Sequence, residues 1–249
     1  MSPPLFWAQT VPEPGTDAVL SGPEGRHAVT VTRVAVGERI VIGDGAGSTA
    51  VCEVQAVESK DTLIARVREF AYVAPPDPQV TVVQALPKSE RSELAVDLAT
   101  EAGADVIVPW QAARCVARWA GKADKGVAKW RAAASSAAKQ SRRAWIPEIT
   151  DLATTTDVRA LCADTIATGG LVAILHEEAT GGLRELPLAQ ANRIVLVIGP
   201  EGGLDDGEVD DLTALGAEPV LLGPEILRTS TAAAVALGAI GVLTERWSR

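Results

Sequence analysis

The segment APPDP at residues 74–78 constrains the fold of this chain more than any other feature, because it places three prolines within four positions. Proline lacks an amide hydrogen and has a fixed φ, so such a segment can continue neither a helix nor a central β-strand. We therefore predict a domain boundary there. A small domain would span residues 1–73 and a larger one residues 79–249, which the 249-residue chain accommodates.

The residues before the linker predict a small β domain. They contain short segments rich in valine and isoleucine, separated by turn residues, which is typical of a β-barrel or a β-sandwich. The predicted strands are 28–34, 39–42, 50–57 and 63–72. The glycine-rich stretch Gly43–Gly47 resembles a phosphate-binding loop, but it connects two of these strands instead of opening a helix. We therefore interpret it as a hairpin turn.

The residues after the linker predict an α/β fold, because strand-like and helix-like segments alternate as in a mostly parallel sheet with helices on both faces. Strands are predicted at 80–86, 105–108, 171–175, 193–198 and 219–222, and helices at 89–102, 126–143, 205–215 and about 230–247. The first of these helices has Ser89 as a capping residue and ends at Gly103. The last helix is apolar on nearly every side, so either a second subunit or the core of its own domain must cover it.

Cysteine and histidine are too few and too scattered for a metal site. Cys52, Cys115 and Cys162 form no CxxC pair, and the chain has only two histidines, His27 and His176. This pattern argues against zinc and against a disulfide framework, so we expect buried thiols in a reducing compartment. The first residues lack the basic start and apolar stretch of a signal peptide, and no apolar run is long enough to span a membrane. These features predict a cytoplasmic protein.

The charge of the chain is unevenly spread. The net charge is −9, yet residues 111–145 contain nine lysines and arginines and a single acid. That segment carries +8 and the remainder −17. A local basic face on an acidic protein can attract phosphates while the rest limits non-specific binding. An ordinary solvated helix face would produce the same composition, so charge alone does not choose between the two.

Three unusual loops follow predicted strands, at residues 175–177, 199–203 and 222–228. Open α/β sheets bind ligands just beyond the carboxyl ends of their strands. In the segment IGPEGGL, the glycines at 199, 202 and 203 let the main chain approach a ligand closely. The segment matches neither GxGxxG nor the Walker pattern, which favours a polar ligand without a phosphate group, such as adenosine.

The third loop, within LLGPEILRTSTA, adds apolar and cationic side chains. Ile226 and Leu227 could sandwich an aromatic base, and Arg228 could hold a phosphate or a polarised carbonyl. The hydroxyls of residues 229–231 could cap the last helix. Turn glycines, core aliphatic residues and a surface arginine would be the purely structural explanation. Three such loops at successive strand exits favour a binding site.

These motifs, taken in order, resemble those of the knotted, SPOUT-type RNA methyltransferases. IGPEGGL followed by LLG and ILRTSTA is similar in detail to the family that methylates N3 of a uridine in 16S ribosomal RNA. Residues 22–33 and the run VGERIVIGDGAG resemble that family's PUA-like RNA-binding domain, and QSRR at 140–143 resembles its QSxR segment. There are two departures, because Glu225 stands where the family usually has arginine and Ser230 where it has glutamate.

The resemblance implies a fold, a cofactor and partners. The fold is a C-terminal domain with a deep trefoil knot, preceded by a PUA-like β-barrel. The partners are 16S rRNA within the small ribosomal subunit and a second copy of the chain, and the cofactor is S-adenosyl-L-methionine. The implied cofactor-binding residues are Leu175, His176, Glu177, Ile198, Gly199, Pro200, Gly202, Gly203, Leu222, Gly223, Ile226, Leu227 and Thr231. The implied RNA-binding residues are Arg26, His27, Arg33, Lys88, Lys139, Gln140, Arg142 and Arg143.

The implied chemistry is direct transfer of a sulfonium methyl group to uracil N3, with loss of the N3 proton. A cation near O2 or O4 would stabilise the developing negative charge, with Arg228 the first candidate and Arg142 or Arg143 the second. Glu201 is a candidate either for the base or for orienting its loop. The alternatives are a catalytically silent RNA-binding protein, in which the two departures mark a decayed site, and a related knotted enzyme acting on tRNA. A nucleotide-dependent oxidoreductase would need a glycine fingerprint that the chain lacks.

Overall fold

The computed structural model describes residues 3–88 and 91–248. The chain forms two compact units, one built from the residues up to Pro75 with Ala138–Ile146, the other from Pro76–Ala137 with the residues after Ile146. The predicted linker lies at the first division of the chain. The sequence did not predict the return of residues 138–146 to the smaller unit.

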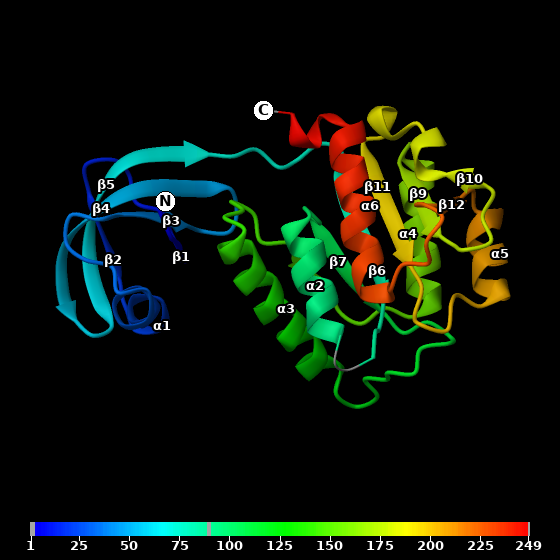
Figure 1. The fold of residues 1–249 in the computed structure, drawn as a ribbon, viewed down its shortest axis with the longest axis horizontal. Coiled ribbons are helices and arrows are strands. Elements are labelled where there is room, and N and C mark those ends of the chain that lie inside the picture. The colour runs from blue at the N-terminus through cyan, green and yellow to red at the C-terminus, as the bar shows by residue number, and fades with distance from the viewer. Residues whose placement is uncertain (1–2, 89–90, 249) are drawn as a thin grey trace. The chain divides into compact units, whose positions relative to one another are not determined.

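The smaller unit is built on a five-stranded mixed sheet in the order β1-β3-β4-β5-β2 (Figure 1). Its strands are β1 Leu5–Trp7, β2 Asp17–Leu20, β3 Arg39–Gly43, β4 Ser48–Ser59 and β5 Thr62–Tyr72. β1 runs parallel to β3, whereas β3–β4, β4–β5 and β2–β5 are antiparallel. Inward-facing residues such as Phe6, Ile40 and Leu63 form a fully buried core. β3, β4 and β5 confirm three predicted strands, and Gly43–Gly47 is the predicted turn.

The strand predicted at residues 28–34 is wrong, because this segment is helical. Helix α1 spans Gly22–Arg26 and continues into η1, His27–Thr32, which has wider turns. A proline in the first turn favours the helix start. Gly25 lets the helix approach the β4–β5 turn, since a Cβ there would lie 2.1 Å from the carbonyl oxygen of Asp61. Valine and threonine favour a strand locally, but the helix buries Ala28 in the core.

The larger unit contains a seven-stranded parallel sheet in the order β10-β12-β9-β11-β6-β7-β8. Its strands are β6 Gln79–Ala85, β7 Val106–Trp110, β8 Glu148–Ile149, β9 Leu171–Leu175, β10 Gly181–Gly182, β11 Arg193–Ile198 and β12 Glu218–Leu221. Its helices are α2 Ser92–Glu101, α3 Ala123–Gln140, α4 Thr155–Ala167, α5 Asp206–Ala214 and α6 Thr229–Leu243, with short turns η3 Leu183–Glu185, η4 Leu188–Gln190 and η5 Glu245–Trp247. The end of α3 leads into the smaller unit. The predicted α/β fold with a parallel sheet is confirmed.

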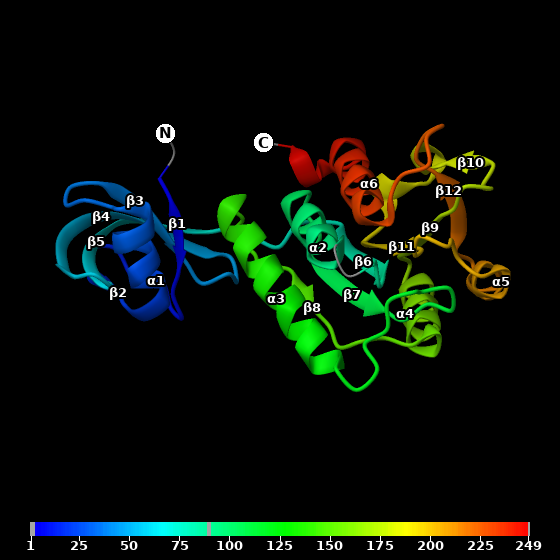
Figure 2. The same ribbon diagram turned by 60° about the horizontal axis from the view of Figure 1, so that its bottom comes forward.

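Helices cover both faces of the parallel sheet (Figure 2). On one face α6 packs beside α2 and against β6 and β11, and on the other α4 contacts β9, β11 and α5. Strands covered on both faces appear in a sequence as nearly continuous apolar runs, which is why β6 and β11 could be predicted. Helix α6 follows β12 but packs against β6 and β11, so the chain crosses back over the sheet after β12. The knot itself stays a prediction.

Several predicted helix starts and caps differ from the structure; α3, for example, begins at Ala123 and not at residue 126. The capping residue Ser89 lies outside the described residues, and α2 begins at Ser92. The helix ends at Glu101 with Ala102 as its C-cap residue, and Gly103, the predicted cap, follows with φ +107°. The predicted hydroxyl cap of α6 is wrong, because Arg228 is the N-cap residue and makes no side-chain cap hydrogen bond. Thr229 and Ser230 are instead buried in the first turn.

The three cysteine thiols are buried and free. Burial raises the pKa of Cys52 and of Cys162 to about 11, so both stay protonated at neutral pH. Over residues 3–88 and 91–248, no three histidine, cysteine or acidic side chains gather in a way that could hold a metal ion. No helix in the same ranges combines the length and the apolar character needed to cross a membrane.

Candidate active site

A cleft of about 720 Å³ lies at the carboxyl ends of β6, β9, β11 and β12. These strands are neighbours in the sheet, in the order β12-β9-β11-β6. The loops that follow them therefore lie side by side, although they are far apart in the sequence. The volume is within the range of small-molecule sites, and the position is where open α/β sheets bind ligands.

The predicted loops supply most of the cleft lining. All the predicted cofactor-binding residues except Thr231 line the cleft. Successive residues of a helix turn by about 100°, so the start of α6 presents only part of its circumference to the cleft. Thr229, Ser230 and Ala232 face it, whereas Thr231 does not.

Glycines shape the loop between β11 and α5. Gly203 has φ +73°, a left-handed conformation that favours glycine. A Cβ on Gly199 would lie 3.0 Å from Cγ of Leu204 and 3.3 Å from its amide nitrogen. A side chain at either position would distort the loop. Because both positions are glycine, the main chain of the loop can face the cleft.

The predicted catalytic residues lie in different settings. Arg228 lines the cleft and is exposed at the N-terminus of α6. Glu201 also lines the cleft, and its Oε1 accepts a hydrogen bond of 3.0 Å from the backbone N–H of Lys88. This bond ties the β11–α5 loop to the loop after β6. Arg142 belongs to the smaller unit, where it has φ +59° and is exposed.

Arg114 holds the same glycine loop from another direction, and the sequence analysis did not single it out. Its guanidinium donates to the carbonyl oxygen of Leu204 at 2.8 Å and pairs with Asp205 and Asp206 at 3.3 and 3.2 Å. A Cβ on Gly202 would lie 3.6 Å from the Cβ of Arg114. Arg114 therefore fixes the cleft side of the loop.

Glu208 is a second residue that sequence reasoning missed. This buried carboxylate accepts hydrogen bonds from the backbone N–H groups of Ala113 and Asp205, at 2.9 and 3.2 Å, and from the Thr155 hydroxyl at 3.1 Å. It also closes a capping box with Asp205 at the start of α5. The spacing of these two acids in the sequence was a signal that could have found it.

Most of the charges around the cleft are segregated. Lys88, Arg91 and Arg114 come from segments after β6 and β7, and the acidic Glu177, Glu178 and Glu225 come from loops after β9 and β12. These strand pairs lie on opposite sides of β11. Arg228 is the exception, because it is a basic lining residue that follows β12, and the acidic Glu201 and Asp206 follow the central β11. The cleft therefore has an acidic end suited to a cationic group and a basic end suited to a phosphate.

The predicted RNA-binding residues divide between the two units. Lys88 lines the cleft, and the others lie in the smaller unit, with Arg26, Arg33, Gln140 and Arg142 exposed and His27 and Arg143 partly exposed. Lys139 forms a 2.5 Å ion pair with Glu24, and its side chain is only 18% exposed. The His27 ring packs edge-on against Phe6. Lys139 and His27 thus have clear structural contacts within their unit.

The two departures from the family pattern lie at different depths. Glu225 is exposed, whereas Ser230 is buried in the first turn of α6. In the described part of the chain, no hydrogen bond joins them. The structure therefore gives no support for an arrangement in which Glu225 and Ser230 replace an arginine–glutamate pair.

Comparisons with known proteins cover both units. A model of the RNA methyltransferase domain family matches residues 75–241, and a model of the RNA methyltransferase PUA domain matches residues 20–68. The chain is 53% identical to ribosomal RNA small subunit methyltransferase E of Mycobacterium bovis, over 98% of this chain and 93% of that protein. It is 33% identical to the protein of the same name from Bacillus subtilis, over 91% and 90% of the two chains.

A solved structure agrees with these sequence matches. A Legionella pneumophila methyltransferase in complex with bound SAM superimposes with a TM-score of 0.84 and is 27% identical, over 98% of this chain and 99% of that one. The smaller unit is thus PUA-like, and the larger is a SPOUT-like methyltransferase domain. With its cleft at the predicted loops, the chain belongs to the RNA methyltransferase family that includes ribosomal RNA small subunit methyltransferase E.

Proposed function

We propose that this chain transfers the methyl group of S-adenosylmethionine to N3 of a uridine in 16S ribosomal RNA. The observation that carries the proposal is the cleft where the loops after β9, β11 and β12 bring glycine main chain and apolar side chains together. The name shared by the relatives supports a small-subunit ribosomal RNA as substrate. The SAM bound in the Legionella structure supports the cofactor.

The residues of the cleft fit this cofactor. Leu175, Ile226 and Leu227 offer apolar contacts for an adenine ring, and the glycine loop leaves main-chain polar groups to bind its edge. At the acidic end, Glu177 and Glu225 would attract the cationic sulfonium and ammonium groups. When bound, S-adenosylmethionine supplies an activated methyl group on a positively charged sulfur.

The chain's own residues must orient the uracil, balance charge at its oxygens and remove the N3 proton. We assign Arg228 to the uracil O2 or O4, where negative charge develops as N3 loses its proton. Oε1 of Glu201 is held by the Lys88 amide, which supports an orienting role and leaves Oε2 as the proton acceptor. The N3–H bond would break toward Oε2, and the freed electron pair of N3 would form the bond to the methyl carbon as the methyl–sulfur bond breaks and its electrons stay on the leaving thioether. Arg142 and Arg143 are the second candidates for charge stabilisation.

We assign two partners to the chain. RNA phosphates would approach the basic end of the cleft, with the target base unpaired or flipped from its stack. A second copy of the chain would cover α6, whose apolar Val235 and Val242 are 43% and 74% exposed. Thr231 and Gly238 extend that face at helical spacing and would let another helix approach closely. The ribosomal substrate implies that the reaction takes place in the cytoplasm.

The test is methyl transfer from labelled S-adenosylmethionine to unmodified small ribosomal subunits, beside free ribosomal RNA and tRNA, followed by nucleoside analysis. We expect 3-methyluridine with the small subunit and no label in tRNA. Label in tRNA would favour the related knotted enzymes. Cofactor binding without transfer to any of the three RNAs would indicate a catalytically silent RNA-binding protein.

Arg114→Ala is expected to weaken S-adenosylmethionine binding about fivefold or more, because the glycine loop loses a charged hydrogen bond and two ion pairs. Isothermal titration calorimetry measures this change. Arg159→Ala is the matched control, since it breaks an exposed pair with Asp211, at 3.1 Å, between α4 and α5. Equal affinities for the two variants would show that Arg114 does not position the loop.

A further inference from the structure

The returning segment of the smaller unit is held by the glycine-rich turn between β3 and β4. Gly45 and Gly47 have φ values of +72° and +99°. The N–H of Gly47 donates to the carbonyl oxygen of Ala144 at 3.1 Å, and that of Ile146 donates to Gly45 at 3.0 Å. A Cβ on Gly47 would lie 2.7 Å from the ring of Trp145. The glycine-rich turn thus binds residues 144–146. This contact explains the glycines of the turn without a phosphate ligand.

Trp145 extends this contact to the end of β5. Its Nε1 donates to the carbonyl oxygen of Val73 at 2.8 Å, and the N–H of Val73 donates to Gly47 at 2.9 Å. The Trp145 ring meets Tyr72 edge to face, with centroids 6.3 Å apart and planes at 74°. The segment that carries Arg142 and Arg143 therefore has a defined place beside β5.

The end of β5 exposes two aromatic side chains. Phe70 and Tyr72 are two positions apart, so they point to the same side of the strand, and they are 45% and 59% exposed. The chain contains nine aromatic residues, six of them tryptophan. Two aromatic rings thus face solvent on one strand, and Tyr72 contacts the partly exposed Trp145. We call Phe70, Tyr72 and Trp145 the aromatic edge.

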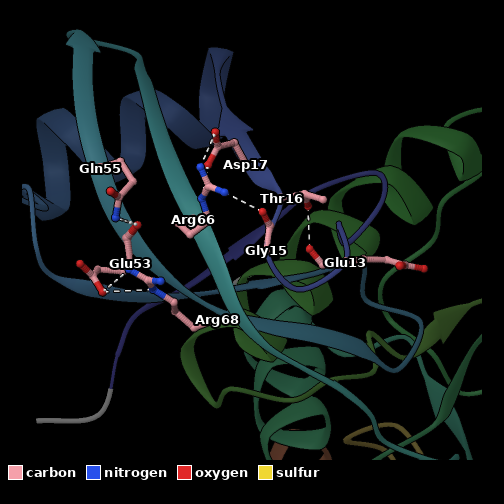
Figure 3. A network of polar contacts seen from close by, with 8 residues as sticks. All are labelled: Glu13, Gly15, Thr16, Asp17, Glu53, Gln55, Arg66 and Arg68. Atoms are coloured by element: carbon pink, nitrogen blue, oxygen red, sulfur yellow. Dashed lines mark hydrogen bonds and ion pairs between the residues drawn. The ribbon is translucent and has the colours of Figure 1, made fainter.

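The two arginines that precede Phe70 on β5 form ion pairs within the protein (Figure 3). Arg66 pairs with Asp17 at 2.8 Å and donates to the carbonyl oxygen of Gly15, and Arg68 pairs with Glu53 at 3.1 Å. These pairs balance the charge of the strand. The returning segment carries two further arginines just before Trp145 in the sequence, of which Arg142 is exposed and Arg143 partly exposed.

We propose that the aromatic edge, together with Arg142 and Arg143, binds single-stranded RNA by stacking an unpaired base on Tyr72. Aromatic rings interleaved with arginines are typical of surfaces that take single strands, because every base has a face that can stack. A duplex would present phosphates but no base faces. This inference rests on the proposed function, because it takes RNA as the substrate. It implies that the smaller unit binds the RNA next to the target nucleotide.

The test measures binding of a labelled single-stranded RNA of about ten nucleotides to the full chain by fluorescence anisotropy, at several salt concentrations. Tyr72→Ala is expected to weaken binding about fivefold or more, as for loss of a stacked base, with the slope of log K against log salt unchanged. Tyr72→Phe should bind like the original chain, and Tyr72→Leu, which keeps apolar bulk, should bind as weakly as Tyr72→Ala. Arg142→Gln should weaken binding and reduce the salt slope by about one.

Val19→Ala is the matched control, because Val19 is 59% exposed on β2 of the same unit. Equal RNA affinity of Tyr72→Ala and Val19→Ala would overturn the proposal. Full binding by Tyr72→Leu would also overturn it, because packing and not stacking would then suffice. A change in subunit association of Tyr72→Ala at unchanged RNA affinity would assign the edge to a protein partner instead. Binding is measured without cofactor, so failure of methyl transfer would contradict the proposed function and leave this result standing.

Discussion

Arg246→Ala is expected to lower the free energy of unfolding by about 3–5 kcal/mol, because it removes the cation that pairs with the buried carboxylate of Asp105. The two side chains are 5% and 8% exposed and lie 2.8 Å apart. The Arg246 guanidinium also donates to the carbonyl oxygens of Pro78 and Gly103, both at 2.5 Å. It therefore ties the end of the chain to the starts of β6 and β7. Urea unfolding followed by tryptophan fluorescence measures the loss.

The control is again Arg159→Ala. The side chains of Arg159 and Asp211, which form an ion pair, are 47% and 50% exposed. Exposed pairs contribute about 1 kcal/mol or less, so this variant should unfold near the original midpoint. If Arg246→Ala does not fold, Arg246→Lys keeps the charge without the planar fork and should show an intermediate loss. Equal stabilities of Arg246→Ala and Arg159→Ala would show that Arg246 does not stabilise the fold through Asp105 and the two carbonyl groups.

Arg228→Ala is expected to reduce kcat for methyl transfer to the small subunit by about 100- to 1000-fold, as for removal of one group that stabilises a developing oxyanion. Cofactor affinity should stay within about threefold, because the glycine main chain and apolar residues of the cleft are untouched. Single-turnover transfer and calorimetry separate the two quantities.

Arg184→Ala is the matched control, since Arg184 is an exposed arginine of η3 that does not line the cleft. It should transfer methyl groups like the original chain. Arg228→Lys should recover part of the rate by restoring the charge without the fork. A kcat for Arg228→Ala within threefold of the original would remove Arg228 from the reaction and leave Arg142 or Arg143 as the cation to test.

Much of the larger unit could be predicted because its signals are local. Strands covered on both faces, such as β6, β9 and β11, are nearly continuous apolar runs, and glycines mark the loops after β11 and β12. Once those strands are known to be parallel, their carboxyl ends must lie at one edge of the sheet. Almost all the predicted cofactor-binding residues therefore line the cleft. Thr231 is the exception, because it lies in α6, where the rotation between successive helical residues turns it away from the cleft.

The sequence by itself determined the α/β fold, the family and most of the residues that line the cleft, and it placed a linker at the first of the divisions between the two units. Only the tertiary structure decided which distant residues hold these parts in place. Glu208 reaches the backbone of Ala113 across 95 positions, and Lys139 reaches Glu24 across 115. Residues 22–32 are helical against their strand-like composition, because packing on the sheet outweighs a local preference of a fraction of a kcal/mol. Local patterns record propensity and burial, whereas partners at such separations exist only once the chain has folded.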